Sequence, residues 1–347
     1  MGSGCDYSEL RDKGFSSDQI NQILKFESEG YKYTYDITPS ISTANIRFLR
    51  KLYSKKTFSP VVFSDFVKKF NSNIDVSKYF NEDCVTAFTP TQLNVLCSCQ
   101  EYNLKHPQKD FSRLINPSFN SEQMVILRSV IIKGKFNYKI FNSNIPSANM
   151  EIIAKAFAED IDDDAFYDFS FSTTQLETLI RAKAEGFDLK YIANPNLSIE
   201  CMNALISALK DNLDIKDIAS EYYSIEDLHI FISALKNGYD ISYLLKYEFS
   251  SEQRKVIVSG MKNNIDFTVY ADPKFDASQM KTIKLFLENK FDTKEILNKN
   301  LSPEKMKLLF DLKINNIKDK TILDEDITDA EAKIICKLLK KGYKIKK

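Results

Sequence analysis

The chain has 347 residues and a formal net charge of zero, because 48 Lys and Arg residues balance 48 Asp and Glu residues. This balance leaves no overall field to hold a polyanion or a membrane surface, and no apolar run of about 18 residues is present to span a bilayer. A hydrophobic fraction of 43% with 28% charged residues is typical of a folded chain. We therefore expect a cytoplasmic protein without membrane contact.

Residues 1–14 are expected to form an N-terminal tail, whose first four residues resemble an expression scar. Residues 15–118 are predicted to form irregular helical repeats. Their units begin at Phe15, Ile41, Phe58 and Phe88. The second of these units is shortened to 17 residues and is expected to lose its second helix, and the fourth carries an insertion at residues 105–109.

Residues 119–347 are predicted to form regular repeats that end in a C-terminal cap. The same residue pattern returns every 26 residues, from Phe119, Ile145, Phe171, Leu197, Tyr223, Phe249, Phe275, Leu301 and Ile327. A fixed period in this range is typical of stacked units that cannot bury their apolar faces alone. The sequence predicts an all-α fold, an α-solenoid forming a right-handed superhelix of about thirteen 26-residue units. Each unit has a long helix A and a short helix B.

The first half of each unit is predicted to be helix A. Counting from the first apolar residue of the unit, position 2 is Ser, Thr, Asn or Asp in twelve of thirteen units, as a helix N-cap requires. Position 5 is often Gln, which completes a reciprocal capping box with the N-cap residue. These glutamines are Gln19, Gln92, Gln123, Gln175, Gln253 and Gln279. Apolar residues at positions 6, 9 and 12 or 13 form the buried stripe.

The second half of each unit is predicted to turn and form helix B. Position 16 is Gly in five units and Asn in five more, Asn103 among them, and both residue types tolerate the left-handed conformation that ends a helix. Position 18 is commonly Asp, which we interpret as the N-cap of helix B. These aspartates are Asp75, Asp110, Asp162, Asp188, Asp214, Asp240, Asp266 and Asp292. Position 22 then carries one inward-facing residue, such as Ile192 or Leu244.

The sequence contains no recognisable catalytic or cofactor site. Its two histidines, His106 and His229, lie in different units, and no phosphate-binding loop, zinc-protease or nucleophile-elbow motif occurs. The six cysteines are scattered and include no CxxC metal-binding pair. We therefore expect a non-enzymatic protein with no cofactor, no metal and no small-molecule substrate.

Two series of lysines recur on the predicted outer face of helix A and are the first candidates for binding a partner. They are Lys255, Lys281, Lys307 and Lys333 at position 7, and Lys210, Lys236, Lys262 and Lys340 at position 14. At about 100° per residue both series point away from the buried stripe. They form either a basic ridge for an acidic protein surface or a phosphate backbone, or a solvated face whose lysines pair with nearby acids.

The insertion adds Lys105, His106 and Lys109 as further candidate partner-binding residues. Insertions in repeat proteins map to loops, often on the binding face. The alternative is a tolerated surface loop, because added loop length costs little free energy.

Residues 249–283 and 119–130 carry the pattern F-x-x-x-Q-M-x-x-I … D-x-x-x-Y-A-x-P-x-F in whole or in part. This pattern resembles the 26-residue helix-turn-helix repeats of proteins from low-GC Gram-positive bacteria and their mobile elements. The resemblance covers residues 119–345 well and 15–118 loosely, and it implies an α-solenoid and a mobile-element setting, with no catalytic residue to transfer.

The function we expect is a repeat scaffold that binds another protein. In a mobile-element setting, one such role is the inhibition of a defence complex, as an anti-CRISPR protein does. The alternative is a nucleic-acid-binding helical repeat protein. It is disfavoured because the sequence pI of about 6.8 is below that of basic nucleic-acid-binding domains.

Ala208→Leu should lower the free energy of unfolding by about 1–3 kcal/mol, because a larger side chain at position 12 overpacks the contact between neighbouring helices. Lys210→Leu, on the outer face of the same predicted helix, is the control and should be close to neutral. Chemical denaturation of both variants measures the difference. Equal effects would mean that helix A is assigned the wrong rotational phase.

Overall fold

The computed structural model describes residues 6–32, 36–54, 60–71 and 88–344. Within these ranges the chain forms fifteen α-helices and five short 3-10 helices, and no β-strand. The predicted all-α class is therefore confirmed. The chain divides into two compact parts, residues 1–186 and residues 187–347.

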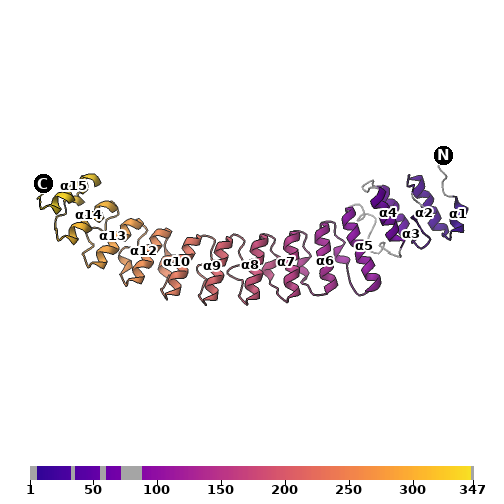
Figure 1. Cartoon of the computed structure of the whole chain (residues 1–347), viewed down its shortest axis with the longest axis horizontal. Coiled ribbons are helices and arrows are strands. Elements are labelled where there is room, and N and C mark those ends of the chain that lie inside the picture. The colour runs from indigo at the N-terminus through magenta and orange to yellow at the C-terminus, as the bar shows by residue number, and fades with distance from the viewer. Residues whose placement is uncertain (1–5, 33–35, 55–59, 72–87, 345–347) are drawn as a thin grey trace. The chain divides into compact units, whose positions relative to one another are not determined.

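The first part packs its helices in chain order. Its described α-helices are α1 (Tyr7–Asp12), α2 (Ser17–Ser28), α3 (Thr43–Ser54), α4 (Pro60–Phe70), α5 (Pro90–Lys105), α6 (Ser121–Lys133), α7 (Ser147–Ala158) and α8 (Thr173–Ala184). Each contacts the next one along the chain, and α6, α7 and α8 stand side by side (Figure 1). The 3-10 helices η3 (Ser112–Leu114), η4 (Tyr138–Ile140) and η5 (Asp164–Tyr167) lie between the later helices.

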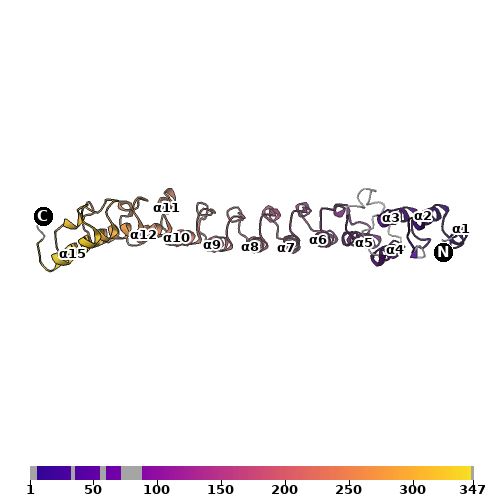
Figure 2. The same ribbon diagram turned by 90° about the horizontal axis from the view of Figure 1, so that it is seen from above.

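The second part follows the same scheme. Its described helices are α9 (Ile199–Lys210), α10 (Ile225–Lys236), α11 (Ser242–Lys246), α12 (Ser251–Lys262), η6 (Phe267–Val269), α13 (Ala277–Glu288), α14 (Pro303–Ile314), η7 (Thr321–Leu323) and α15 (Asp329–Lys340). The long helices contact each other in order, and α11 is a short helix between α10 and α12. Seen from above, the segments that follow α9 and α10 return on one side of those helices (Figure 2).

Part of the predicted N-terminal tail is helical. Residues 7–12 form α1, whose Leu10 is 3% exposed, and α1 packs against α2. Asp6 caps this helix by accepting a hydrogen bond from the backbone N–H of Ser8 at 3.4 Å. The expectation of a tail through residue 14 was therefore wrong for these residues, because one buried leucine is enough to dock a short capped helix on its neighbour.

The predicted capping boxes are confirmed at all six position-5 glutamines. In α6, the Asn120 backbone N–H donates to Gln123 Oε1 at 2.8 Å, and the Gln123 backbone N–H donates to Asn120 Oδ1 at 2.8 Å. Each box therefore satisfies two of the backbone N–H groups at or next to the start of its helix.

The same glutamine side chains also join one unit to the next, which the sequence analysis did not foresee. Gln123 Nε2 donates to the carbonyl oxygens of Ser143 at 3.0 Å and Ile145 at 2.7 Å. We call this pair of bonds the amide bridge: it runs from position 5 to position 25 and to the first residue of the following unit. It recurs at Gln19, Gln92, Gln253 and Gln279.

Where position 5 is not Gln, other side chains partly take its place. Asn149 Nδ2 donates to the Phe171 carbonyl at 2.9 Å, and Lys305 Nζ donates to the Asp324 carbonyl at 2.7 Å. Asp227 instead binds Arg254 of the next unit, with Nη1 2.8 Å from Oδ1. Both side chains of this pair are 9% exposed.

Position 16 ends helix A as predicted in most described units, with two additions and one correction. Positive φ angles occur at the Gly and Asn residues of this position, and also at Asp160 (61°) and Lys290 (56°). Asn103, however, lies inside α5, which runs on to Lys105 and is capped by His106 at φ −136°. The extra residues of the insertion lengthen this helix, so its end moves past Asn103. The predicted Asp75 and the Asn at residue 73 lie outside the described residues.

The predicted short helix B is mostly a single turn. Six position-18 aspartates accept a bond from the backbone N–H two residues later, as an N-cap does, at 2.9–3.1 Å. Within the described residues only α11 continues as an α-helix, while the other described segments are 3-10 or irregular turns. In one unit Asp163 is the cap instead, and Asp162 accepts a bond from the Tyr167 hydroxyl at 2.7 Å. Four or five residues are too few to close further turns before the next unit begins.

Position 22 is the buried anchor of each of these turns. The side chains at this position are 0–1% exposed in Leu114, Ile140, Phe166, Ile192, Ile218, Leu244, Tyr270, Ile296 and Ile322. The predicted inward-facing residue is therefore confirmed, and it seats the returning segment against the core.

Tyr270 is the largest of these anchors, and Gly260 makes room for it. A Cβ added to Gly260 would lie 1.9 Å from Tyr270 Oη, while the corresponding position of the four preceding units is Ala. Gly260 is therefore small to accommodate the aromatic ring of its own unit.

Gly260→Ala alone should destabilise the protein by about 1–3 kcal/mol through overpacking against Tyr270. Adding Tyr270→Leu should recover part of that loss, because the smaller anchor removes the clash and the helix gains a better former. Urea denaturation of the two single variants and the double variant gives the coupling, which we expect to be about 0.5–3 kcal/mol. Additive effects would contradict the contact.

Asp227→Ala should destabilise by about 3–5 kcal/mol, because it leaves the buried Arg254 charge without its partner. The double variant Asp227→Gln/Arg254→Met should be neutral or stabilising, since Gln is the common residue at position 5 and Met recurs at position 6, and apolar replacement of a buried ion pair is often neutral or favourable. Denaturation midpoints of the two variants compare their stabilities. A double variant as unstable as Asp227→Ala would contradict the expectation that Gln and Met can replace the ion pair.

The same pair should make the native protein sensitive to acid. Burial alone would raise the pKa of Asp227, but hydrogen bonds from Ser251 and Ser224 and the charge of Arg254 lower it overall. A depressed pKa adds stability above the unfolded value of about 3.9, and that stability is lost as the pH falls further. Asp227→Gln/Arg254→Met should therefore lose less stability than the native chain between about pH 5 and pH 2.

Candidate functional site

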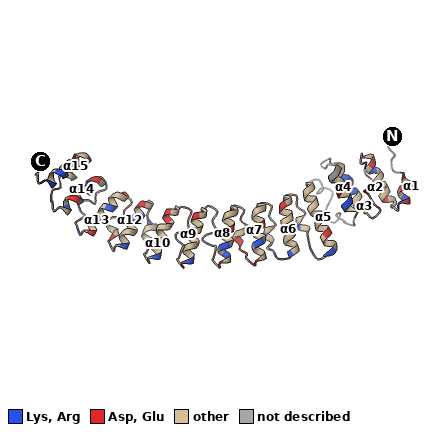
Figure 3. Cartoon of the chain, viewed as in Figure 1, with Lys and Arg blue, Asp and Glu red and all other residues tan. Residues whose placement is uncertain are grey.

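The position-7 lysines lie on the exposed faces of α12 to α15, as predicted, but most are engaged by acids of the preceding unit. Lys255 Nζ lies 2.8 Å from Glu252 and also pairs with Glu226. The pairs Lys281–Glu252, at 4.0 Å, and Lys333–Glu304, at 3.3 Å, likewise join a position-7 lysine to a glutamate of the preceding unit, as in Lys255–Glu226. Figure 3 shows acidic and basic segments interspersed along these helices.

The charge of Lys255 is the most strongly compensated of the series. The hydrogen bond to Glu226, followed by that to Glu252, raises the pKa of the Lys255 ammonium. The hydrogen bond from Lys255 in turn lowers the pKa of the Glu252 carboxyl. Among the residues that the structure describes, Lys307 is the position-7 lysine without an ion pair, so the predicted ridge is largely neutralised by its own neighbours.

The position-14 lysines are exposed at the C-terminal ends of their helices. Lys236 lies 2.7 Å from Asp211, and Lys340 pairs with Asp311, again from the preceding unit in each case. Lys210 and Lys262 occupy the corresponding places on α9 and α12. Both lysine series therefore connect successive units at the surface as well as facing solvent.

The insertion residues lie beside the ends of α5 and α6. Lys105 is the exposed last residue of α5, and His106 packs against Tyr102 with ring centroids 4.4 Å apart. Lys109 is half-buried, and a Cβ added at Gly134 would lie 3.1 Å from its Nζ. Lys109 thus covers the C-terminal end of α6, where a cation is favourable.

A shallow groove between α12 and α13 brings two of the candidate lysines together. It has a volume of about 480 Å³ and is lined by Glu252, Lys255, Val256, Ser259, Lys281, Lys284 and Leu285. Glu252 forms ion pairs with both Lys255 and Lys281. Lys284 pairs with Glu288 at 3.0 Å. Ion pairs therefore occupy most of the polar lining of this groove.

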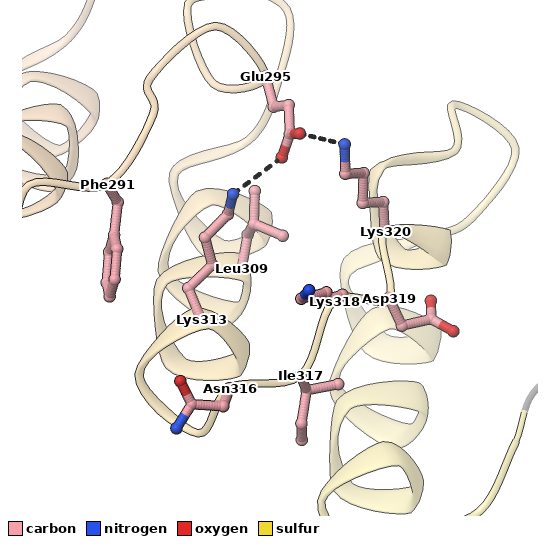
Figure 4. Close-up of a pocket in the computed structure, with 9 residues that line it drawn as sticks. All are labelled: Phe291, Glu295, Leu309, Lys313, Asn316, Ile317, Lys318, Asp319 and Lys320. Carbon is pink, nitrogen blue, oxygen red and sulfur yellow. Dashed lines mark ion pairs between the residues drawn. The ribbon is translucent and has the colours of Figure 1, made fainter.

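A second pocket, of about 360 Å³, is built around Glu295 (Figure 4). The Glu295 carboxylate lies between Lys313, 3.3 Å away, and Lys320, while Phe291, Leu309 and Ile317 supply apolar walls. The hydrogen bond from Lys320 is the main cause that lowers the pKa of Glu295, against the opposing effect of burial. This arrangement ties the segment before α14 to the segment after it.

A concave surface that sequence reasoning missed lies over α5, α6 and α7. It is a groove of about 870 Å³ with Val95, Val130 and Ile126 in its lining and Val125 54% exposed at its surface. Its remaining residues are Thr91, Asn94, Ser121, Glu122, Ser129, Lys133, Ser147, Ala148, Glu151, Ala154 and Lys155. Val125 stands at position 7, where α12 to α15 carry lysine. Position 7 on the outer face is therefore apolar in α6 and charged in α12 to α15.

The described residues contain no group of three or more His, Cys, Asp or Glu side chains that could hold a metal ion. Burial raises the pKa of the Cys97 and Cys99 thiols to about 12, which makes them poor nucleophiles at neutral pH. No helix in the described ranges is long and apolar enough to cross a bilayer. Comparison of the chain with family models, curated proteins and solved structures finds no match.

Reversing Lys255, Lys281 and Lys307 to Glu together should weaken binding steeply if the ridge contacts a partner, and should lower stability only modestly, because exposed ion pairs contribute ~0–1 kcal/mol each. For a duplex nucleic acid, three lost phosphate contacts should flatten the slope of log affinity against log salt by roughly two to three. An acidic protein should instead lose mainly association rate. Unchanged binding would leave the ridge as a solvated face.

Proposed function

We propose that this chain is a non-enzymatic α-solenoid, a right-handed superhelix of about thirteen 26-residue units, that binds another protein through the outer face of its long helices. The observation that carries the proposal is the exposed apolar groove over α5 to α7. Solvated helix faces are ordinarily polar, and an apolar hollow on such a face is typical of an interaction site.

The repeated amide bridge supports the architectural part of the proposal. It links a helix start to the following unit at the same two backbone positions in units of both compact parts. A structure held by nearest-neighbour contacts of this kind grows by adding units and offers an extended binding surface.

A protein partner is favoured over a nucleic acid by the charge on the described outer face. Nucleic-acid affinity comes largely from cations that neutralise phosphates. Here Lys255, Lys281 and Lys333 are already paired with acids of the preceding unit. An apolar groove flanked by both signs of charge is suited instead to a folded or folding polypeptide.

The test is affinity capture with the full chain as bait from a lysate of a low-GC Gram-positive bacterium, with and without nuclease. We expect a protein that survives nuclease treatment and is lost with the bait variant Val125→Asp/Ala148→Asp. Ile334→Asp, which changes an exposed apolar residue on α15 outside the described grooves, is the matched control and should retain it. Recovery of nucleic acid alone, or loss of every protein on nuclease treatment, would contradict the proposal.

A further inference from the structure

The groove over α5 to α7 limits the kind of polypeptide that it can bind. No strand occurs in the described ranges, so a partner strand has no sheet edge to extend here. The lining contains no aromatic residue, which disfavours the stacked docking of proline-rich segments, and no arginine, which disfavours phosphopeptides. Of the common recognition modes, a helix lying in an apolar groove remains.

The shape and composition of the groove suit such a helix. The small side chains of Ser129, Ala148 and Ala154 line the groove together with the bulkier Val125 and Ile126. A volume of about 870 Å³ lies within the range in which pockets bury several apolar groups. An amphipathic helix would fill it with side chains spaced i, i+3, i+4 and i+7.

The charges at the two ends of α6 supply an orientation. Glu122 lines the end near the start of α6, and Lys133, the last residue of α6, lines the other end. Their separation of eleven positions corresponds to about 16 Å of helix. Glu151 and Lys155 neutralise each other at 2.8 Å, whereas neither Glu122 nor Lys133 has an ion pair within the described part of the chain. The groove therefore presents one carboxylate and one ammonium about three turns apart.

Only one direction of a bound helix satisfies these charges and its own dipole together. A cation is needed over Glu122 and an anion over Lys133. Helices favour acids near their N-terminus and bases near their C-terminus. A bound helix with an acidic N-terminus and a basic C-terminus places its acid over Lys133 and its base over Glu122 only if it runs antiparallel to α6.

We propose that the α5–α7 groove binds an amphipathic α-helix of a partner protein, antiparallel to α6, with an acidic residue in its first turn against Lys133 and a basic residue in its last turn against Glu122. This inference rests on the proposed protein-binding function and names the chemistry of the partner. The bland alternative is that Glu122 and Lys133 only complement the dipole of α6 and that Val125 is an isolated exposed apolar residue.

The probes are two stapled helical peptides of equal composition, with leucines at i, i+3, i+4 and i+7, long enough to span the three turns of the groove. One carries Glu near its N-terminus and Lys near its C-terminus, and the other has these two residues exchanged. Fluorescence anisotropy with the full chain should show that the first peptide binds about threefold or more tightly than the second, because two exposed charge pairs change sign.

Three variants complete the test, with circular dichroism to confirm folding. Val125→Asp and Ala148→Asp, both at exposed positions, should each weaken the first peptide about tenfold, while Ile334→Asp on α15 should leave it unchanged. Glu122→Lys/Lys133→Glu should reverse the preference between the peptides.

The inference is overturned if neither peptide binds, if Val125→Asp binds as the native chain does, or if the charge exchange leaves the preference unchanged. Its failure is distinguishable from failure of the proposed function. A protein captured after nuclease treatment by the native bait and equally by Val125→Asp/Ala148→Asp would leave protein binding intact and place it on another face.

Discussion

The side-chain amide at position 5 is the constraint on which the rest of this structure depends. In Gln279, Oε1 accepts from the N-cap N–H of Asp276 at 2.8 Å, while Nε2 donates to the carbonyls of Lys299 at 3.0 Å and Leu301 at 2.8 Å. One buried group thus fixes the start of its own helix and the start of the next unit. Because these carbonyls must lie within hydrogen-bond reach, the bond fixes where the next unit begins in space, and Gln92 makes the same two bonds across a unit lengthened by the insertion.

Departures from the amide bridge show what the position requires. Asp227 keeps the capping function by accepting from the Ser224 backbone N–H at 3.3 Å, but it has no amide hydrogen to donate. Arg254, at the usually apolar position 6 of the next unit, is its counter-ion. Glu331 on α15 is exposed and accepts from the Thr328 N–H at 2.8 Å. A carboxylate therefore suffices for the cap, whereas contact with the next unit needs a hydrogen-bond donor or a compensating cation.

Much of the helical framework was predictable, because caps, apolar stripes and left-handed helix ends are local signals. The amide bridge was not predictable, since the capping box already explained each glutamine. Lys290 and Asp160 also gave no sign in the sequence of a helix end.

The candidate site was harder to predict from the sequence than the helical framework. The lysine series was visible, but its pairing with acids of the preceding unit, such as Glu226 with Lys255, depends on packing. The α5–α7 groove was hidden because Val125 and Ile126 merely widen an apolar stripe; a missing lysine at position 7 was the available signal.

The most direct test of the amide bridge separates its two functions. Gln279→Glu keeps the acceptor that caps α13 but removes both donors to Lys299 and Leu301, whereas Glu331→Gln makes the opposite exchange at an exposed cap. We expect Gln279→Glu to lower the free energy of unfolding by about 1–3 kcal/mol, because buried carbonyls lose their partners, and Glu331→Gln to change it by less than about 0.5 kcal/mol. Urea denaturation at neutral pH measures both. Equal, small effects would show that the capping box alone accounts for the glutamines and would contradict this account.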